Sequence, residues 1–294
     1  MGSPCHVAIY AKNQKIAKTA AHEVIDDVQR LEAKYSRYRH DSLLNKINRE
    51  AFSSRGVWVD EEMAGLLDYA NTCHVESDGL FDVTSGILRN VWNFSTQNQK
   101  IPDPSEIAPF LEKIGWGDKV SWERPVIRFL KEGMELDFGG ICKEYAADRA
   151  VAICEKHGIT SGVVNFGGDL RVIGPHPDGA SWKIAISHPR KQGHTLAMLN
   201  VKRGAVATSG DYERCIDIEG KRYSHILNPK TGWPIAGLTS VSVVAPFALI
   251  AGSASTIAML KGKEEGPAWL ESMDLPALWV DDDGNVHQRT LSDL

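Results

Sequence analysis

The sequence lacks the features that define several large classes of protein. None of its apolar runs approaches the ~20 residues that a membrane-spanning helix requires. It has no internal repeat, no low-complexity tract and no obvious linker. No Lys/Arg-rich face is evident, and a net charge of -5 over 294 residues argues against a nucleic-acid partner. We therefore expect a soluble globular protein with no membrane span and no nucleic-acid partner.

Cysteine is also scarce, and its spacing excludes two kinds of site. The five cysteines are odd in number, widely scattered and contain no CxxC pair, so they predict neither a disulfide framework nor a zinc site. Buried, inert thiols in a reducing compartment are the expected state.

The composition is that of an ordinary globular chain, with 43% hydrophobic and 24% charged residues. A chain of this length buries roughly three quarters of its unfolded surface, enough for one large domain or two intimate ones. The apolar pattern at Ile16, Ala20, Val24, Val28 and Leu31 has helical spacing.

The order of predicted elements indicates an α+β protein with a largely antiparallel series of strands. Helices are predicted at 16–34, 61–74 (with Asp60 as cap), 143–157 (ending at Gly158) and 248–260. Strands are predicted at 6–10, 126–129, 134–137, 162–165, 171–173, 182–186, 196–201, 240–244 and finally 277–280. The polar segment 97–109 contains three prolines and is the predicted main surface loop.

Residues 208–214 (TSGDYER) and 223–232 (YSHILNPKTG) concentrate polar chemistry in a short stretch. The first run predicts a polar loop between strands 201–207 and 215–218, with Gly210 free to adopt a positive φ. His225 precedes an Asn-Pro turn, where an imidazole of near-neutral pKa can face a ligand. Ordinary hairpin turns remain an equal alternative from these residues alone.

Each of two glycine pairs is compatible with either a ligand site or a structural turn. Asp137-Phe-Gly-Gly140 precedes a helix opened by Lys143, an arrangement that lets backbone and ammonium groups approach a phosphate. A tight packing turn with a solvated lysine is the alternative. The run Asn165-Phe-Gly-Gly-Asp169 equally suits a hairpin turn.

Several runs occur along the chain in a fixed order. They are Met1-Gly-Ser, YSRYRHDSLLNKIN at 35–48, GLFDVT at 79–84 with WNF at 92–94, ELDFGGICKEYAAD at 135–148, and VNFGGDLR at 164–171, followed by the two runs at 208–214 and 223–232. They resemble the motifs of the ApbE family, the FAD:protein FMN transferases. The family patterns for the first five read M-G-T, S-x-Y-x-x-x-S-x-L-x-x-x-N, F-D-x-T…W-x-F, D-L-G-G-I-A-K-G-Y-A-x-D and N-x-G-G-D-x-R.

This resemblance implies one ApbE-like domain over 1–294, with two interlocked α+β subdomains, largely antiparallel sheets and the flavin site between them. The implied reaction transfers FMN from FAD to a Ser or Thr hydroxyl of an acceptor protein and releases AMP. FAD pyrophosphatase activity and non-catalytic FAD binding are the alternatives.

The resemblance also implies roles for individual residues. His225 is the expected general base, with Asp211 the next candidate, and FAD and Mg²⁺ are the expected ligands. The expected FAD contacts are Met1, Tyr38, Leu80, Phe81, Asp82, Asp137, Lys143 and Leu227, and the expected metal ligands are the Gly140 carbonyl and Thr256.

One departure from the family pattern concerns the metal. The family run A-D-A-x-A-T-A corresponds to Ala251-Gly-Ser-Ala-Ser-Thr-Ile257, so Gly252 stands where the metal-binding Asp is expected. No Asp occurs between Asp217 and Asp274 to replace it. We expect weakened Mg²⁺ affinity, and we expect Gly252→Asp to strengthen it.

The resemblance also bears on location. Many family members are exported or lipid-anchored, with a signal segment ahead of the Met-Gly-Thr motif. If Met1 is the native start, the expected location is the cytoplasm.

Overall fold

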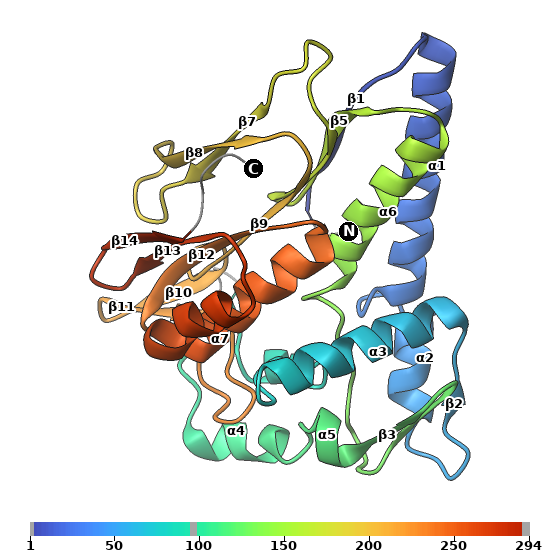
Figure 1. Cartoon of the computed structure of the whole chain (residues 1–294). Helices are drawn as coiled ribbons and strands as arrows, with labels where there is room; N and C mark the ends of the chain where they lie inside the picture. The colour runs from blue at the N-terminus through green and yellow to red at the C-terminus, as the bar shows by residue number, and fades with distance from the viewer. Residues whose placement is uncertain (1–2, 95–98, 290–294) are drawn as a thin grey trace. The chain divides into compact units, whose positions relative to one another are not determined.

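The computed structural model describes residues 3–94 and 99–289 (Figure 1). The chain divides into two compact units. The first unit consists of Met1–Glu32, Gly140–Tyr212 and Ala236–Leu294, and the second of Ala33–Gly139 and Glu213–Ile235. Each unit is therefore assembled from segments that are separated in the sequence.

A seven-stranded sheet in the order β1-β5-β6-β9-β12-β13-β14 organises the first unit. Every neighbouring pair in it is antiparallel, so each strand exchanges backbone hydrogen bonds with a partner that runs the other way. Its strands are β1 (Cys5–Tyr10), β5 (Ser161–Phe166), β6 (Asp169–Gly174), β9 (Gly204–Gly210), β12 (Leu238–Ala245), β13 (Ala277–Asp281) and β14 (Val286–Arg289).

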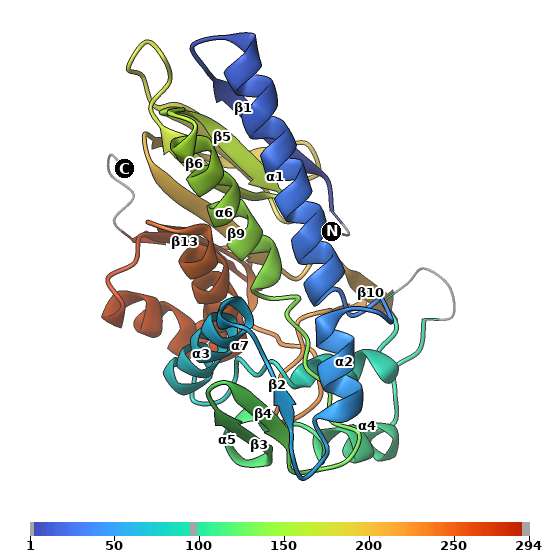
Figure 2. The same cartoon turned by 90° about the vertical axis from the view of Figure 1, so that its right-hand side faces the viewer.

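The two faces of this sheet are covered differently. Val172 and Val206 lie in an apolar cluster with Ile184 and Leu199 of the hairpin formed by β7 (Trp182–Ser187) and β8 (Thr195–Val201). Arg171, one residue from Val172 and hence on the opposite face, reaches helix α6. The sheet therefore lies between a hairpin and a helical layer, and Figure 2 shows α6 lying along β5 and β6.

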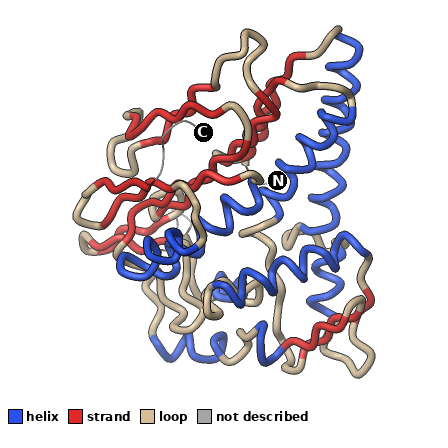
Figure 3. The backbone as a smooth tube through the Cα atoms, viewed as in Figure 1, coloured by secondary structure: helices blue, strands red, loops and turns tan. Residues whose placement is uncertain are grey.

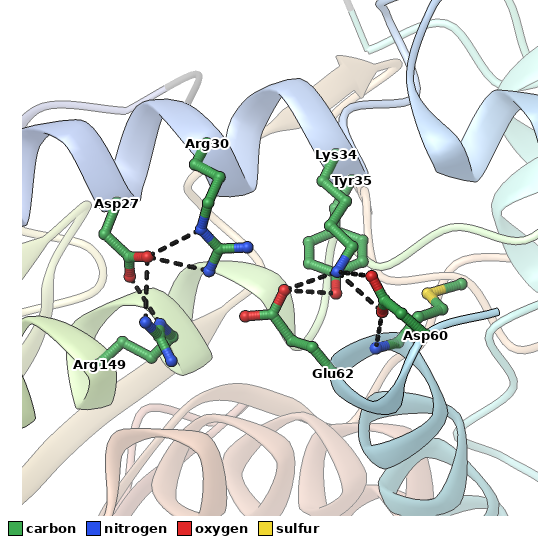
Figure 4. Close-up of polar contacts among 8 residues, drawn as sticks. Asp27, Arg30, Lys34, Tyr35, Asp60, Glu62 and Arg149 are labelled. Carbon is green, nitrogen blue, oxygen red and sulfur yellow. Dashed lines mark hydrogen bonds and ion pairs between the residues drawn. The ribbon is translucent and has the colours of Figure 1, made fainter.

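Three helices belong wholly or mainly to the first unit: α1 (Gln14–Tyr35), α6 (Cys142–Lys156) and α7 (Ala248–Ser272). Asp27 of α1 pairs with Arg30 on the same helix and with Arg149 of α6 (Figure 4). Asp148 of α6 accepts hydrogen bonds from the first N–H groups of α7. The N-cap residue of α7, Phe247, has no side-chain oxygen that could accept them. Polar contacts from one helix to the next therefore join the helical layer together.

The second unit contains short strands among helices and loops (Figure 3). Lys34 and Tyr35 meet the carboxylate of Glu62, and Lys34 also pairs with Asp60, the N-cap of α3 (Figure 4). The strands form a sheet of order β2-β4-β3 and a β10-β11 hairpin. The elements are α2 (Leu43–Glu50), β2 (Val57–Trp58), α3 (Glu61–Glu76), the 3₁₀ helix η1 (Ser85–Asn90), α4 (Pro104–Leu111), α5 (Trp116–Lys119), β3 (Val120–Glu123), β4 (Val126–Phe129), β10 (Cys215–Ile218) and β11 (Lys221–Ser224).

The predicted α+β class and antiparallel pairing are confirmed, and most predicted elements lie within a few residues of the observed ones. Within the described residues no helix combines the length and apolar character needed to cross a membrane.

Some local predictions are wrong. Part of the predicted surface loop is α4, because Asp103 and Glu106 form a capping box and Pro104 occupies the first turn, where its missing N–H costs nothing. Residues 134–137 form no strand, since the Leu136 backbone bonds the Asn48 side chain instead. The sheet ends with β14 rather than with the strand at 277–281.

Candidate functional site

Tyr38 and Asp137, both predicted FAD contacts, lie in one small constellation of the second unit, and Arg37 joins them. The Arg37 guanidinium donates to an Asp137 carboxylate oxygen and, at 2.8 Å, to the Tyr38 hydroxyl. It also stacks 4.9 Å from the centre of the Tyr38 ring. Burial alone would lower the pKa of Arg37, but the Asp137 charge and the Tyr38 contact hold that pKa above its ordinary value.

Arg37 therefore fixes two candidate ligand contacts at once. Tyr38 is 74% exposed, so its ring remains available for stacking. Asp137 is further fixed by the Gly139 N–H, which donates to its second oxygen at 2.9 Å. The sequence run that contains Arg37 gave no sign of this pairing, because Asp137 lies 100 residues further along the chain.

The predicted contacts Leu80, Phe81 and Asp82 follow α3 in the chain, and the Phe81 N–H donates to Ser77, the C-cap of that helix. Leu80 is half-buried, whereas Phe81 and Asp82 are buried. The Asp82 carboxylate is used locally: it accepts from Thr84 and from the Trp116 N–H that opens α5. A hollow of about 430 Å³ in this unit is lined by apolar side chains such as Leu111 and by polar ones, including His74, Asp78, Asp82, Asp118, Lys119 and Lys230.

Lys143 lies on the first turn of α6 in the first unit, as predicted. Its ammonium donates to Asp169, a buried carboxylate, and lies 3.2 Å from Glu144. Asp169 follows the predicted hairpin turn, which is confirmed: Phe166 pairs with Asp169 across Gly167 and Gly168, with φ values of 60° and 97°. The alternative of a merely solvated Lys143 is therefore wrong.

His225 has the geometry of a proton acceptor. Its Nδ1 lies 3.1 Å from the Arg214 carbonyl oxygen. Because a carbonyl only accepts, Nδ1 carries the proton of the neutral ring, and Nε2 keeps its lone pair. Burial lowers the pKa of His225 below its ordinary value of 6.5, outweighing the hydrogen bond to Arg214. The imidazole is therefore neutral at neutral pH.

The surroundings of His225 are aromatic and apolar. Phe94 meets the imidazole edge to face, with ring centres 6.5 Å apart. Leu227, a predicted FAD contact, packs against the apolar cluster around Trp92 and Ile216. Met1, another predicted contact, lies outside the described residues.

The loop prediction at 208–214 is wrong in detail. The strand β9 continues through Thr208 and Ser209 to Gly210, because these residues pair with β12. Gly210 accordingly has no positive φ. Asp211, the alternative base, receives a bidentate pair from Arg190 at 2.7 and 2.6 Å, so its oxygens are already engaged.

The predicted metal ligands both belong to the first unit. Gly140 lies in the turn that leads into α6, and no side chain caps that helix. Thr256 lies on α7, where the Ser209 hydroxyl is 3.0 Å from its own. Gly252, one turn earlier on α7, directly faces Glu144, whose Oε2 is buried without a hydrogen-bond partner among the described residues.

Glu144 is not among the site residues that the motifs predict. The signal was present in the sequence: the family pattern has Gly after its Lys, and this chain has Glu. What the sequence did not contain was the proximity of position 144 to position 252, which arises only when α6 packs on α7.

The chain as a whole resembles proteins of one known family. The sequence model of the ApbE family matches residues 1–279. The FAD:protein FMN transferase of Treponema pallidum is 31% identical over 304 residues, covering 97% of this chain and 84% of the relative. That of Salmonella typhimurium is 30% identical over 265 residues, covering 87% of this chain and 75% of the relative.

Solved structures match equally well. The ApbE protein of Thermotoga maritima superposes with a TM-score of 0.89 at 31% identity, covering 98% of this chain and 94% of that one. The flavin transferase ApbE of Vibrio cholerae superposes with a TM-score of 0.88 at 28% identity, covering 99% and 94%. On its sequence and its fold, the chain belongs to the ApbE family.

Proposed function

We propose that this protein is an FAD:protein FMN transferase. The observation that carries the proposal is the His225 imidazole, a neutral ring whose Nδ1 is fixed to a carbonyl and whose Nε2 can accept a proton. An unactivated Ser or Thr hydroxyl is a weak nucleophile and gains from such a base. Family membership supplies the substrate, FAD, and the class of acceptor, a protein hydroxyl.

The proposed reaction is a displacement at phosphorus. The acceptor hydroxyl oxygen bonds to the phosphorus of the FMN half, the bond from that phosphorus to the bridging oxygen breaks, and His225 takes the hydroxyl proton. AMP leaves with the bridging oxygen and its electron pair. The products are FMN in phosphoester linkage to the acceptor, and AMP.

Charged and aromatic side chains would bind the FAD. Lys143, on the first turn of α6, would face the pyrophosphate, and the uncapped N–H groups of that helix would add positive potential. In the second unit, Tyr38 would stack on the ligand, and Asp137, held by Arg37, would accept a hydrogen bond from it. Support for these roles comes from the motif positions together with the contacts that orient each side chain.

The residues around Glu144 also suit a divalent cation. Its buried Oε2 has no hydrogen-bond partner in the described part of the chain, and the Thr256 hydroxyl and the Gly140 carbonyl are hard oxygen donors of the kind that Mg²⁺ prefers. These groups would hold Mg²⁺, which when bound offsets the negative charge of a pyrophosphate.

We further place the reaction in the cytoplasm. All five cysteines are thiols, and Cys73 and Cys154 are buried. Burial raises the pKa of Cys154 to about 11, which keeps it protonated and unreactive.

The test uses purified protein with FAD, Mg²⁺ and a Ser- or Thr-containing acceptor peptide, and it measures both AMP and the mass of the peptide. We expect AMP in proportion to flavin-labelled peptide. AMP formed equally without peptide would identify an FAD pyrophosphatase instead. FAD binding without AMP under either condition would identify a non-catalytic binding protein.

A further inference from the structure

We propose that Glu144 supplies the carboxylate that the family pattern places at position 252, so that the metal-binding carboxylate of this protein comes from α6 instead of α7. The inference rests on the proposed function, because the cation concerned is the one that would accompany FAD. In this interpretation the carboxylate is not missing: it has moved from position 252 on α7 to position 144 on α6.

The first observation is steric. A Cβ atom built on Gly252 would lie 2.5 Å from Cγ of Glu144 and 3.1 Å from its Oε1. Gly252 has an ordinary helical backbone, so glycine is not required there by φ. The absence of a side chain at 252 instead opens the space that the Glu144 carboxylate fills.

The second observation is a buried carboxylate oxygen that has no hydrogen-bond partner among the described residues. Glu144 is 5% exposed, and its Oε2 has no hydrogen-bond partner within the described part of the chain. Buried carboxylates are normally paired or bound to a metal, because removing a charge from water without compensation is costly. Oε2 therefore needs a partner from outside the described protein groups.

Lys143 does not remove this deficit. Its ammonium contacts Oε1 of Glu144 at 3.2 Å, but it also pairs with Asp169, which is 4% exposed. Two buried carboxylates thus share one ammonium group. The surplus negative charge favours a cation beside Glu144.

The third observation is the neighbouring hydroxyl. Thr256 follows Gly252 by one helical turn, so the two positions lie on the same face of α7, and Gly252 on that face meets Glu144. The Ser209 hydroxyl lies 3.0 Å from that of Thr256 and fixes its direction. A carboxylate from α6 and a hydroxyl from α7 make a set of hard oxygen donors suited to Mg²⁺ or Mn²⁺.

The exchange also corrects the expectation for Gly252→Asp. With Glu144 in place, an aspartate at 252 meets the middle of the Glu144 side chain, which cannot move aside as a flexible end can. The single substitution is therefore expected to destabilise the protein, not to tighten Mg²⁺. Combined with Glu144→Gly, the same aspartate has room and restores the family arrangement.

The test measures Mn²⁺ binding to the full chain by electron paramagnetic resonance, with Mg²⁺ as competitor and with no FAD present. Glu144→Gln keeps the shape of the side chain and removes its charge. We expect it to weaken Mn²⁺ binding by about tenfold or more, because even the hydrogen-bond partners of metal ligands contribute roughly 10–100-fold to metal affinity. Glu155→Gln is the matched control: it lies on the same helix, where its partner is Arg203, and should leave Mn²⁺ affinity unchanged.

The double variant Glu144→Gly/Gly252→Asp should recover Mn²⁺ affinity, because the carboxylate returns from the other helix. Wild-type protein that binds no Mn²⁺, or Glu144→Gln protein that melts normally and binds Mn²⁺ as tightly as the wild type, would overturn the inference. FAD titration and AMP release on the same preparations separate the two ideas. AMP formation with no dependence of Mn²⁺ binding on Glu144 rejects this site alone, whereas Glu144-dependent Mn²⁺ binding without AMP rejects the transferase alone.

Discussion

His225 is the residue whose replacement most directly tests the chemistry. His225→Ala removes the Nε2 acceptor, so transfer should slow by roughly 10²–10⁴-fold while FAD binding, measured by calorimetry, stays near the wild-type value. His22→Ala is the matched control, since His22 also places Nδ1 against a carbonyl, that of Lys18, but on an exposed helix face. Transfer at the wild-type rate in His225→Ala would mean that another group takes the proton.

The same imidazole sets a pH dependence. Burial lowers the pKa of His225, so the active neutral form persists to a pH below 6.5. Transfer measured against pH should therefore be constant around neutrality and fall on the acid side, through an apparent pKa below that of a free histidine. A fall in rate centred above pH 6.5 would contradict this prediction. If the slow His225→Ala variant shows no fall in rate on the acid side, the assignment to His225 is supported.

Lys143 has a structural partner as well as a proposed ligand. Lys143→Ala should weaken FAD binding. It also leaves the buried Asp169 without its ammonium partner, which should lower the free energy of unfolding by about 1–3 kcal/mol. Adding Asp169→Asn should restore stability but not FAD affinity. Calorimetry and denaturant unfolding on both variants separate the two effects. FAD affinity that returns with Asp169→Asn would show that Lys143 acts only through the fold.

Individual motif residues could be predicted from the sequence because their chemistry is local. The position of Lys143 at the start of a helix and the Gly167–Gly168 turn both follow from residues near them in the chain. The partners of these residues could not be predicted in the same way. Arg37 reaches Asp137, and Glu144 faces Gly252, only after distant segments pack together.

Among the elements, α7 depends on a residue outside itself for its N-terminal cap. Asp148 accepts from the N–H groups of Ala248 and Leu249 at 2.9 Å each and also pairs with the buried Arg171. Asp148→Ala should therefore cost about 2–4 kcal/mol in unfolding free energy, since both a cap and a buried charge partner are lost. Asp60→Ala, which uncaps α3, is the comparison and should cost less. Equal costs would mean that Arg171 gains little from Asp148.

Helices and strands were predicted well where the apolar periodicity is strong. They were predicted poorly where hydrogen bonds from distant side chains set the backbone conformation. The helices α1, α3 and α6 have clear apolar spacing or caps, and the structure contains them within two residues of their predicted starts. Residues 134–137 have the composition of a strand, but the Asn48 side chain bonds the backbone of Leu136, and the Asp137 N–H donates to the Val83 carbonyl. Conversely, β9 runs on through hydroxyl residues because Thr208 bonds Ser242 across the ladder.

For the whole molecule, ligand binding is linked to stability. If FAD binds the folded chain alone, FAD at about 100 times its dissociation constant should raise the free energy of unfolding by about 2.7 kcal/mol. Thermal melts over a range of FAD concentrations test this, with riboflavin as the control that lacks both phosphates. Equal shifts with FAD and riboflavin would show that the pyrophosphate adds nothing to binding.

The division of the chain into interleaved units has a consequence for how the protein is made. The backbone passes from one unit to the other near residues 32, 139, 212 and 235, so no single cut in the gene separates them. On the ribosome, β1 emerges more than a hundred residues before β5, its partner in the sheet. Strands β13 and β14 of the same sheet are synthesised later still, more than a hundred residues after β5. The nascent chain must therefore carry β1 unpaired until β5 has been synthesised, and a chain that stops before β13 leaves β12 as an unpaired edge, so we expect such truncated chains to bind chaperones.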